Sequence, residues 1–296
     1  MELHIFKTLW GHTGSLEEAV AECREHGFAG IEGPAPASPA ERKKFRTKLA
    51  QAGLGFIAEI CTAGSYVPDR RASAGQHLES LRRQGEAALE CQPRLLTIIA
   101  GCDAWSTGES VDFFGQALAI GEELGVTTSF ETHRSRSFFS PWATRDILRQ
   151  LPALKLTCDF SHWCVVCERL IDTEPEVLAL CAERAHHAHA RVGYDQGPQV
   201  PHPAAPPYQA ALEAHERWWM QIWRSQAARG MSVSTMTPEF GPDGYLQCLP
   251  FTSVPVADLS QINLWMAERE QRRFAETMLA SSGRPAAPVE AVSAAH

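Results

Sequence analysis

Three short runs of sequence decide the fold: Thr127-Thr-Ser-Phe-Glu-Thr132, Leu154-Lys-Leu-Thr-Cys-Asp159 and His187-Ala-His-Ala-Arg-Val192. We expect each run to form a β-strand, with a helix between neighbouring runs. Ser140-Pro141 begins one helical pattern, which continues to residue 150, and a second pattern covers residues 176–184. Strands that alternate with helices indicate parallel βαβ units. This region therefore predicts a parallel sheet covered by helices.

The same alternation continues outward from these runs in both directions. Further strands are expected at residues 3–9, 28–33, 55–60, 95–100 and 232–239. Further helices are expected from Ser15 to Gly27, from Ser38 onward, and at residues 77–89, 113–124, 210–229 and 259–278. Ser15 and Glu18 have the spacing of a capping box, which satisfies two backbone donors at a helix start.

Eight strands, each followed by a helix, predict a single-domain α/β protein with the (β/α)8 TIM-barrel fold over residues 1–280. Residues 281–296 are rich in small side chains, and we expect them to form a flexible tail. A doubly wound open sheet is the alternative. Residues 10–14, which follow the first strand, lack the third glycine of a dinucleotide-binding turn, so the barrel is favoured.

Composition and charge narrow the class of protein. The chain has 296 residues, of which 44% are hydrophobic, and its net charge is −8. This apolar content excludes a fully disordered chain, and the acidity argues against binding nucleic acid or an anionic membrane through bulk charge. The sequence shows no membrane-spanning run and no signal peptide. Its nine scattered cysteines do not suggest a disulfide framework, so we expect a soluble cytoplasmic protein.

Acidic and histidine side chains gather at the ends of the predicted strands, where barrels of this class place their active sites. These side chains are Glu32, Glu59, Glu131, Asp159, His187, His189 and Glu239. Converging carboxylates repel one another unless a cation lies among them. Oxygen-rich ligands with one imidazole suit Mn²⁺, Mg²⁺ or Co²⁺, with Zn²⁺ as a further candidate.

Four of these motifs resemble the xylose-isomerase-like barrel superfamily. They are Glu131 after strand five, Asp159-Phe-Ser-His162 after strand six, His187-Ala-His189 in strand seven and Glu239 after strand eight. The resemblance extends over nearly the whole chain. This superfamily includes sugar isomerases, ketose 3-epimerases, inosose dehydratases, hydroxypyruvate isomerases and endonuclease IV.

The resemblance implies one divalent metal ion per chain, held by Glu131, Asp159, His189 and Glu239. It also implies that Glu131 and Glu239 move protons on opposite faces of the substrate, and that His162 and Arg191 contact substrate oxygens. The implied reaction is isomerisation or epimerisation of a sugar or keto acid. It removes a proton alpha to a carbonyl through a metal-stabilised enediolate. We expect a small carbohydrate or keto-acid substrate, no nucleic-acid or membrane partner, and a homodimer or homotetramer.

Simpler roles stay open for individual residues. Asp159 could cap the following helix, Glu131 and Glu239 could be surface acids, and His189 could be a core histidine. Glu32 and Glu59 could support the site, contact substrate or lie at the rim. Candidate rim contacts are His12, His133, Arg134 and Arg136.

Three further stretches have competing interpretations. Cys164-Val-Val-Cys167 has the spacing of a redox or zinc pair but stands alone, which favours buried small side chains. Trp218, Trp219 and Trp223 have helical spacing and are expected in the core or at a subunit interface. Residues 193–203 form a long loop, which we interpret as a lid or specificity loop over the metal rather than a surface excursion.

Three other functions compete with the isomerase. An inosose-dehydratase-like lyase would use the same metal and the same proton abstraction. An endonuclease IV-like nuclease is disfavoured because residues 57–60 and 98–101 contain no histidine for the three-metal cluster of that branch. A non-catalytic binding barrel is disfavoured by the complete set of four candidate ligands.

Overall fold

Eight parallel strands form a closed barrel in the computed structural model, which describes residues 1–242 and 244–281. Each strand pairs with the next, and β8 closes the ring on β1. The strands are β1 (Glu2–Thr8), β2 (Gly30–Pro34), β3 (Gly55–Cys61), β4 (Leu95–Ile99), β5 (Thr128–Glu131), β6 (Leu156–Cys158), β7 (Ala185–His189) and β8 (Val233–Thr237). The predicted single-domain (β/α)8 TIM barrel is confirmed.

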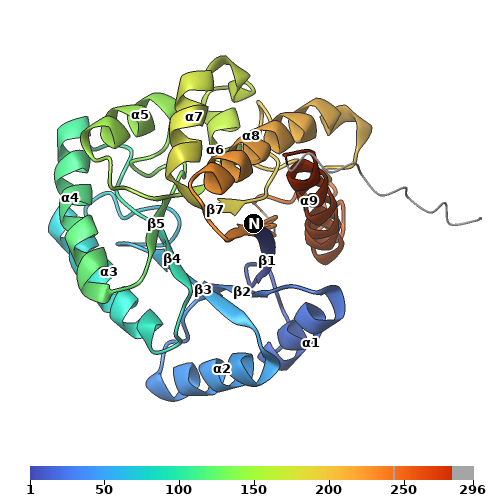
Figure 1. Ribbon diagram of the computed structural model, residues 1–296, viewed down its shortest axis with the longest axis horizontal. Helices are drawn as coiled ribbons and strands as arrows, with labels where there is room; N and C mark the ends of the chain where they lie inside the picture. The colour runs from blue at the N-terminus through green and yellow to red at the C-terminus, as the bar shows by residue number, and fades with distance from the viewer. Residues whose placement is uncertain (243, 282–296) are drawn as a thin grey trace, which may run out of the picture.

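The helices form a ring around this barrel (Figure 1). They are α1 (Leu16–His26), α2 (Pro39–Ala52), α3 (Ala74–Leu89), α4 (Thr107–Leu124), α5 (Pro141–Gln150), α6 (Ser161–Val166), α7 (Pro175–Arg184), α8 (Gln209–Ala228) and α9 (Leu259–Ser281). Two 3-10 turns, at Ile171–Thr173 and Pro206–Tyr208, precede α7 and α8. The flexible tail predicted for residues 281–296 lies outside the described residues, except for Ser281 at the end of α9.

Local signals set the helix ends. Ser15 and Glu18 form the predicted capping box at α1, and Gly27 ends that helix with a left-handed φ of 72°. A glycine adopts this conformation without a steric penalty. Helix α4 begins at Thr107, well before the predicted residue 113, because Ser106 and Glu109 form a capping box that the hydrophobic pattern did not reveal.

Strands β5 to β7 end earlier than the sequence predicts. At the end of β6, the backbone N–H of Asp159 donates to the hydroxyl of Thr132 at 2.8 Å, and that hydroxyl lies 2.8 Å from the Asp159 carbonyl. A side chain thus replaces a neighbouring strand as the partner of the backbone. The polar ends of these runs therefore leave the sheet and lie at the mouth of the barrel.

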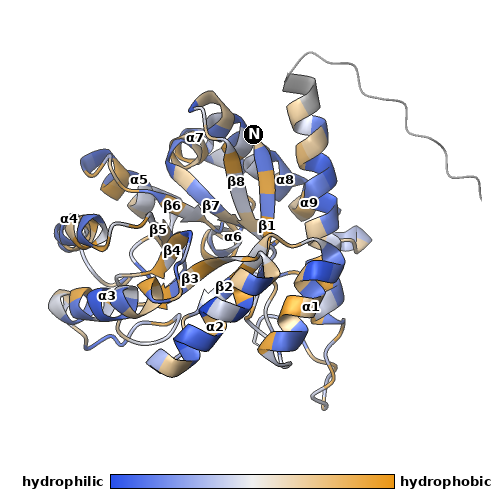
Figure 2. Ribbon diagram, turned by 60° about the horizontal axis from the view of Figure 1, so that its bottom comes forward, coloured by the Kyte–Doolittle hydropathy of each residue, from blue (hydrophilic) through white to orange (hydrophobic). Residues whose placement is uncertain are grey.

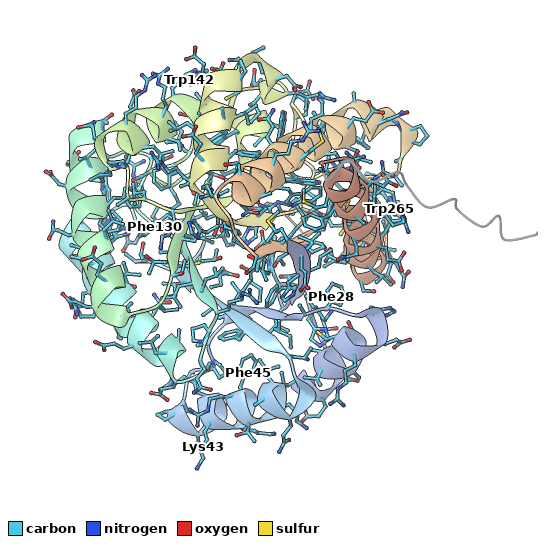
Figure 3. The ribbon with its side chains drawn as sticks, in the orientation of Figure 1. Phe28, Lys43, Phe45, Phe130, Trp142 and Trp265 are labelled. Carbon is cyan, nitrogen blue, oxygen red and sulfur yellow. The ribbon has the colours of Figure 1, made fainter. Side chains whose placement is uncertain are left out.

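The core lies inside the barrel and between the barrel and its helices. In Figure 3, Phe130 of β5 and Phe45 of α2 lie between the barrel and its helices, whereas Lys43 points outward. The ring of Phe130 has its centroid 5.0 Å from that of Phe114 in α4. Figure 2 shows the same division, since apolar residues dominate β4 and the outer helix faces are largely hydrophilic. Cys164 and Cys167 are buried and unbridged, as expected for small core side chains.

The tryptophans of α8 also belong to this core. Trp218, Trp219 and Trp223 each expose no more than 1% of their surface. Because their rings are buried, they cannot form a subunit interface on the surface of the protein. Of the two predicted locations, the core and a subunit interface, the structure shows the core. Among the described residues, no helix is long and apolar enough to span a membrane.

Candidate metal centre

Four side chains from neighbouring strands meet at the mouth of the barrel. Glu131 ends β5, Asp159 follows β6, His189 ends β7 and Glu239 follows β8. One ligand atom from each lies within 4.8 Å of the other three, and all four side chains are buried. Ligands on opposite sides of a small divalent ion lie roughly 4–5 Å apart. The spacing of the four predicted metal ligands thus fits one ion.

Two atoms of this cluster lack a hydrogen bond. Oε2 of Glu131 and Nδ1 of His189 are buried, and neither has a hydrogen-bond partner. Nδ1 lies 3.7 Å from Oε2 of Glu131 and 3.0 Å from Oε2 of Glu239. A buried polar atom without a partner costs about 1–3 kcal/mol. A divalent cation would satisfy both atoms, and three carboxylates with one imidazole form a suitable donor set.

Glu32 orients the imidazole of His189. Oε1 of Glu32 lies 3.1 Å from Nε2 of His189, and Oε2 lies 3.0 Å from Nε2 of His187. When Nε2 of His189 donates to this carboxylate, Nδ1 is the nitrogen left to bind a metal. Burial raises the pKa of Glu32, but the two histidines outweigh it and hold the pKa well below its usual range. Glu32 therefore contacts a ligand candidate and is buried, with 1% of its surface exposed.

Burial and neighbouring carboxylates shift the pKa values of the groups around the cluster. Burial, reinforced by Glu239 and Glu131, raises the pKa of Glu59 to about 8. Burial also raises the pKa of Glu131 to about 7, although His189 opposes the rise. Burial lowers the pKa of His189, yet Glu239, Glu32 and Glu131 together raise it well above its usual value. A cation that binds here displaces protons from these groups, so binding strengthens as pH rises.

Arg191 lies beside the same cluster, two residues beyond His189. Its Nη2 donates to the Asp159 carboxylate and lies 2.7 Å from Nε2 of His162. Its Nη1 lies 3.3 Å from the backbone carbonyl oxygen of Glu239 and 3.4 Å from Oε2 of the same residue. Burial lowers the pKa of Arg191, but Asp159 and Glu239 raise it above its usual value. The two predicted substrate contacts, Arg191 and His162, thus lie together next to the ligands, and their contact with substrate stays a prediction.

A cavity of about 330 Å³ lies next to the cluster. Its lining includes the polar side chains Glu59, Glu131, His133, Arg191 and Glu239 and the side chains Leu9, Trp10, Pro34, Tyr66, Ile99 and Tyr245. Nδ1 of His133 donates to the carbonyl of Arg134, which leaves Nε2 as a hydrogen-bond acceptor. A cavity of this size accommodates a small molecule.

The other candidate rim residues take different places. His12 lines a neighbouring hollow together with Lys7 and Glu22. Arg134 lies over the ring of Tyr245 at 4.9 Å. Arg136 is fully buried and donates to backbone carbonyls of the loop after β3, including those of Thr62 and Tyr66. Arg134 therefore lies near the cavity, and Arg136 lies buried against the loop after β3.

The loop at residues 193–203 is anchored to the barrel. The side chain of Gln199 donates to the carbonyl of Gly241 and accepts from its N–H, at 3.1 and 2.7 Å. Val200 is buried, and its N–H donates to the Val192 carbonyl. The cavity lining given above contains no residue of this loop. These contacts give no support to the prediction that the loop covers the metal.

Three aromatic residues that line the cavity were not predicted from the sequence. Trp10 follows β1, Tyr66 follows β3 and Tyr245 follows β8. The ring of Tyr245 contacts Trp10 edge-on, with centroids 4.8 Å apart, and lies 6.3 Å from Tyr66. An aromatic residue shortly after a predicted barrel strand is the signal that could have found them, because these loops surround the mouth.

The closed eight-stranded barrel, with this cluster at the carboxyl ends of its strands, defines the class of protein as a (β/α)8 TIM barrel. The model of the xylose isomerase-like TIM barrel family matches residues 20–199 of the chain. Because this match covers more than half of the sequence, the chain belongs to that family. No curated protein sequence gave a significant match.

Solved structures share the fold over almost the whole chain. The structure of an L-ribulose 3-epimerase has 13% identity and a TM-score of 0.63, covering 95% of this chain and 97% of its own. The IOLI protein, described with a binding zinc atom, has 14% identity and a TM-score of 0.58, with 95% and 97% coverage. Endonuclease IV from Thermus thermophilus has 15% identity and a TM-score of 0.55, with 93% and 99% coverage. At these identities, the similarity shows the fold alone.

Proposed function

We propose that this protein is a divalent-metal-dependent isomerase or epimerase that acts on a sugar or a keto acid. The observation that carries the proposal is the convergence of Glu131, Asp159, His189 and Glu239 on one buried point beside a cavity. The two buried atoms of Glu131 and His189 that lack a hydrogen bond add to it. The L-ribulose 3-epimerase of similar fold is an enzyme of this reaction class.

A bound divalent cation would polarise a substrate carbonyl and stabilise the negative charge that forms on its oxygen. Mn²⁺, Mg²⁺ and Co²⁺ suit the donor set, and the zinc in the IOLI structure keeps Zn²⁺ among the candidates.

Glu131 and Glu239 are the groups that we assign to proton transfer. Both carboxylates line the cavity, and they extend from β5 and from the segment after β8, which lie on different sides of His189 in the barrel order. One carboxylate can therefore remove a proton from a substrate carbon while the other returns a proton to the opposite face. Such general acid–base groups contribute about 10²–10⁴-fold each to the rate.

The aromatic walls and His133 would bind the rest of the substrate. Tyr66, Trp10 and Tyr245 offer flat apolar surfaces, which suit the C–H face of a sugar. His133 offers an acceptor for a hydroxyl group. These contacts favour a polyhydroxylated compound over a purely apolar one.

The test combines metal analysis with solvent exchange. Protein purified without chelator should contain about one divalent ion per chain. With Mn²⁺ in D₂O, proton NMR of ketoses, inososes and short hydroxy-keto acids should reveal deuterium at a carbon next to a carbonyl in at least one of them. Removal of the metal with a chelator should stop this exchange. A chain that holds no ion and exchanges no substrate proton contradicts the proposal.

The same experiment distinguishes the lyase. A dehydratase would also exchange or remove the alpha proton, but its product spectrum would show loss of water and a new unsaturated carbon. The fold is shared with a probable 3-DHS dehydratase at 14% identity and a TM-score of 0.54, so this product is the second outcome to look for.

A further inference from the structure

A second group of possible ligands lies beside the first. Glu131, His133 and His162 are buried and bring one ligand atom each within 4.8 Å of the others. Glu131 belongs to both groups. Nε2 of His162 lies 3.7 Å from Oε1 of Glu131. Two metal ions that share a carboxylate lie about 3.5–4 Å apart in many enzymes. By residue type and spacing alone, this site could therefore hold two ions.

The guanidinium of Arg191 donates a hydrogen bond to one nitrogen of that second group. Nη2 of Arg191 lies 2.7 Å from Nε2 of His162, so the imidazole accepts a hydrogen bond there and its lone pair is no longer free. Nδ1 of His162 then carries the proton, and it has no hydrogen-bond partner. Burial, His133 and Arg191 all lower the pKa of His162 well below its usual value, which agrees with a neutral ring.

The hydrogen-bonding capacity of Arg191 is used within the protein. Nε donates to the Ser161 hydroxyl at 3.1 Å, and Nη2 reaches Asp159 and His162. Nη1 reaches the carbonyl and the carboxylate of Glu239. A guanidinium has five N–H donors. Four hydrogen bonds use donors on Nε, Nη1 and Nη2, and the remaining N–H of Nη1 has the Glu239 carboxylate 3.4 Å from its nitrogen as an ion-pair partner.

The faces of the guanidinium are covered as well. The rings of Tyr245 and Trp10 have centroids 4.8 and 5.5 Å from its central carbon, and Arg191 is only 1% exposed. Arg191 is thus enclosed among metal-ligand candidates and carries a fixed positive charge.

We propose that Arg191 is a built-in cation that takes the place of a second metal ion. Its charge lies against Asp159 and Glu239 on one side and blocks His162 on the other, so that the centre accepts one divalent ion. In this role Arg191 is a positioning residue that also sets the number of metals bound. The inference rests on the proposed metal centre. The inference extends that proposal, because it explains the binding of a single ion by the position of Arg191 and not by a shortage of ligands.

The experiment compares metal stoichiometry in three proteins and a control. Isothermal titration with Mn²⁺ should give one ion per chain for the wild type. Arg191→Met removes the charge and frees His162, and it should bind two ions per chain. Arg191→Lys keeps a positive charge and should bind one. Arg134→Met is the matched control, because Arg134 also lies over Tyr245 but contacts none of the four ligands, and it should bind one.

A spectroscopic measurement locates the second ion. Two Mn²⁺ ions bridged by Glu131 are magnetically coupled, so Arg191→Met saturated with Mn²⁺ should lose the six-line spectrum of an isolated ion. The double variant Arg191→Met/His133→Ala should return to one ion per chain and to the isolated-ion spectrum. Neither measurement depends on catalytic activity.

The outcomes separate this inference from the proposed function. A wild type that binds no ion contradicts the proposed function. A wild type that binds two ions, or an Arg191→Met protein that binds one ion like the wild type, overturns the role of Arg191 and leaves the metal centre in place. If Arg191→Met does not fold by circular dichroism, Arg191→Gln is the neutral replacement that keeps hydrogen-bond donors. The wild-type stoichiometry tests the inference in either case.

Discussion

Glu32 and His189 are joined by a buried contact of 3.1 Å between Oε1 and Nε2. The other ring nitrogen of His189 faces Glu131 and Glu239. The orientation of this metal-ligand candidate therefore depends on a carboxylate that is itself outside the four-ligand cluster. Partners of this kind fix the tautomer of a metal-binding histidine and increase its basicity.

Glu32→Ala should lower the affinity for Mn²⁺ about 10–100-fold, the usual effect of removing such a partner. Glu32→Gln should lower it less, since the amide oxygen still accepts from Nε2. Isothermal titration measures both affinities. The control is Glu270→Gln, which alters a fully buried carboxylate in α9 next to Arg273. Equal affinities in Glu32→Ala and the wild type would show that Glu32 does not support the ligand.

Glu131→Gln and Glu239→Gln should each reduce exchange of the substrate alpha proton by at least about 10²-fold at saturating Mn²⁺. Each amide keeps the shape of the side chain but cannot take a proton from carbon. Deuterium incorporation followed by NMR measures the effect, with circular dichroism to verify folding. Glu270→Gln is the matched control, because Glu270 is also a fully buried carboxylate but lies in α9 and does not line the cavity. Exchange retained in both ligand variants would reject the two-carboxylate mechanism.

Much of the barrel could be predicted because its signals are local. The alternation of strands and helices lies in the hydrophobic pattern, and Ser15, Ser38 and Gly27 mark helix ends through backbone hydrogen bonds close in sequence. The four ligand candidates could be named for a similar reason. Each one follows a strand, and the fold brings such positions together.

The rest depends on contacts between residues far apart in sequence. Glu32 and His189 are separated by 157 positions, and no spacing rule connects them. The contacts of Arg136 with the loop after β3 are likewise absent from any local pattern. The helical spacing of Trp218, Trp219 and Trp223 does not distinguish a face that packs on the barrel from one that meets another subunit, and their burial alone decides this.

The thermal stability of the metal-free protein should fall as pH rises from about 5 to 8, in part because of Glu59. Burial and the neighbouring Glu239 and Glu131 raise the pKa of Glu59 to about 8 from an ordinary value of 4.5. The folded state thus binds this proton over a pH range where the unfolded state has lost it, and stability decreases through that window.

Glu59→Gln removes this proton equilibrium, so the variant should gain Tm relative to the wild type as pH rises from about 5 to 8. The gain should then level off. Differential scanning calorimetry in the presence of a chelator measures the difference at each pH. A difference in Tm that does not vary with pH would show that Glu59 does not retain its proton in the folded protein.

Arg136→Met should loosen the loop that carries Tyr66. The buried guanidinium donates to the carbonyls of Thr62, Ser65, Tyr66 and Gly101 at the ends of β3 and β4. Burial lowers the pKa of Arg136 to about 10, yet the group is retained because it satisfies these acceptors. Its loss leaves buried carbonyls unpaired at about 1–3 kcal/mol each, so we expect a lower Tm and faster trypsin cleavage at the exposed residues 70 and 71. Arg82→Met, which removes an exposed arginine paired with Glu123, is the control. Unchanged Tm and cleavage in Arg136→Met would mean that the loop holds its position without the guanidinium.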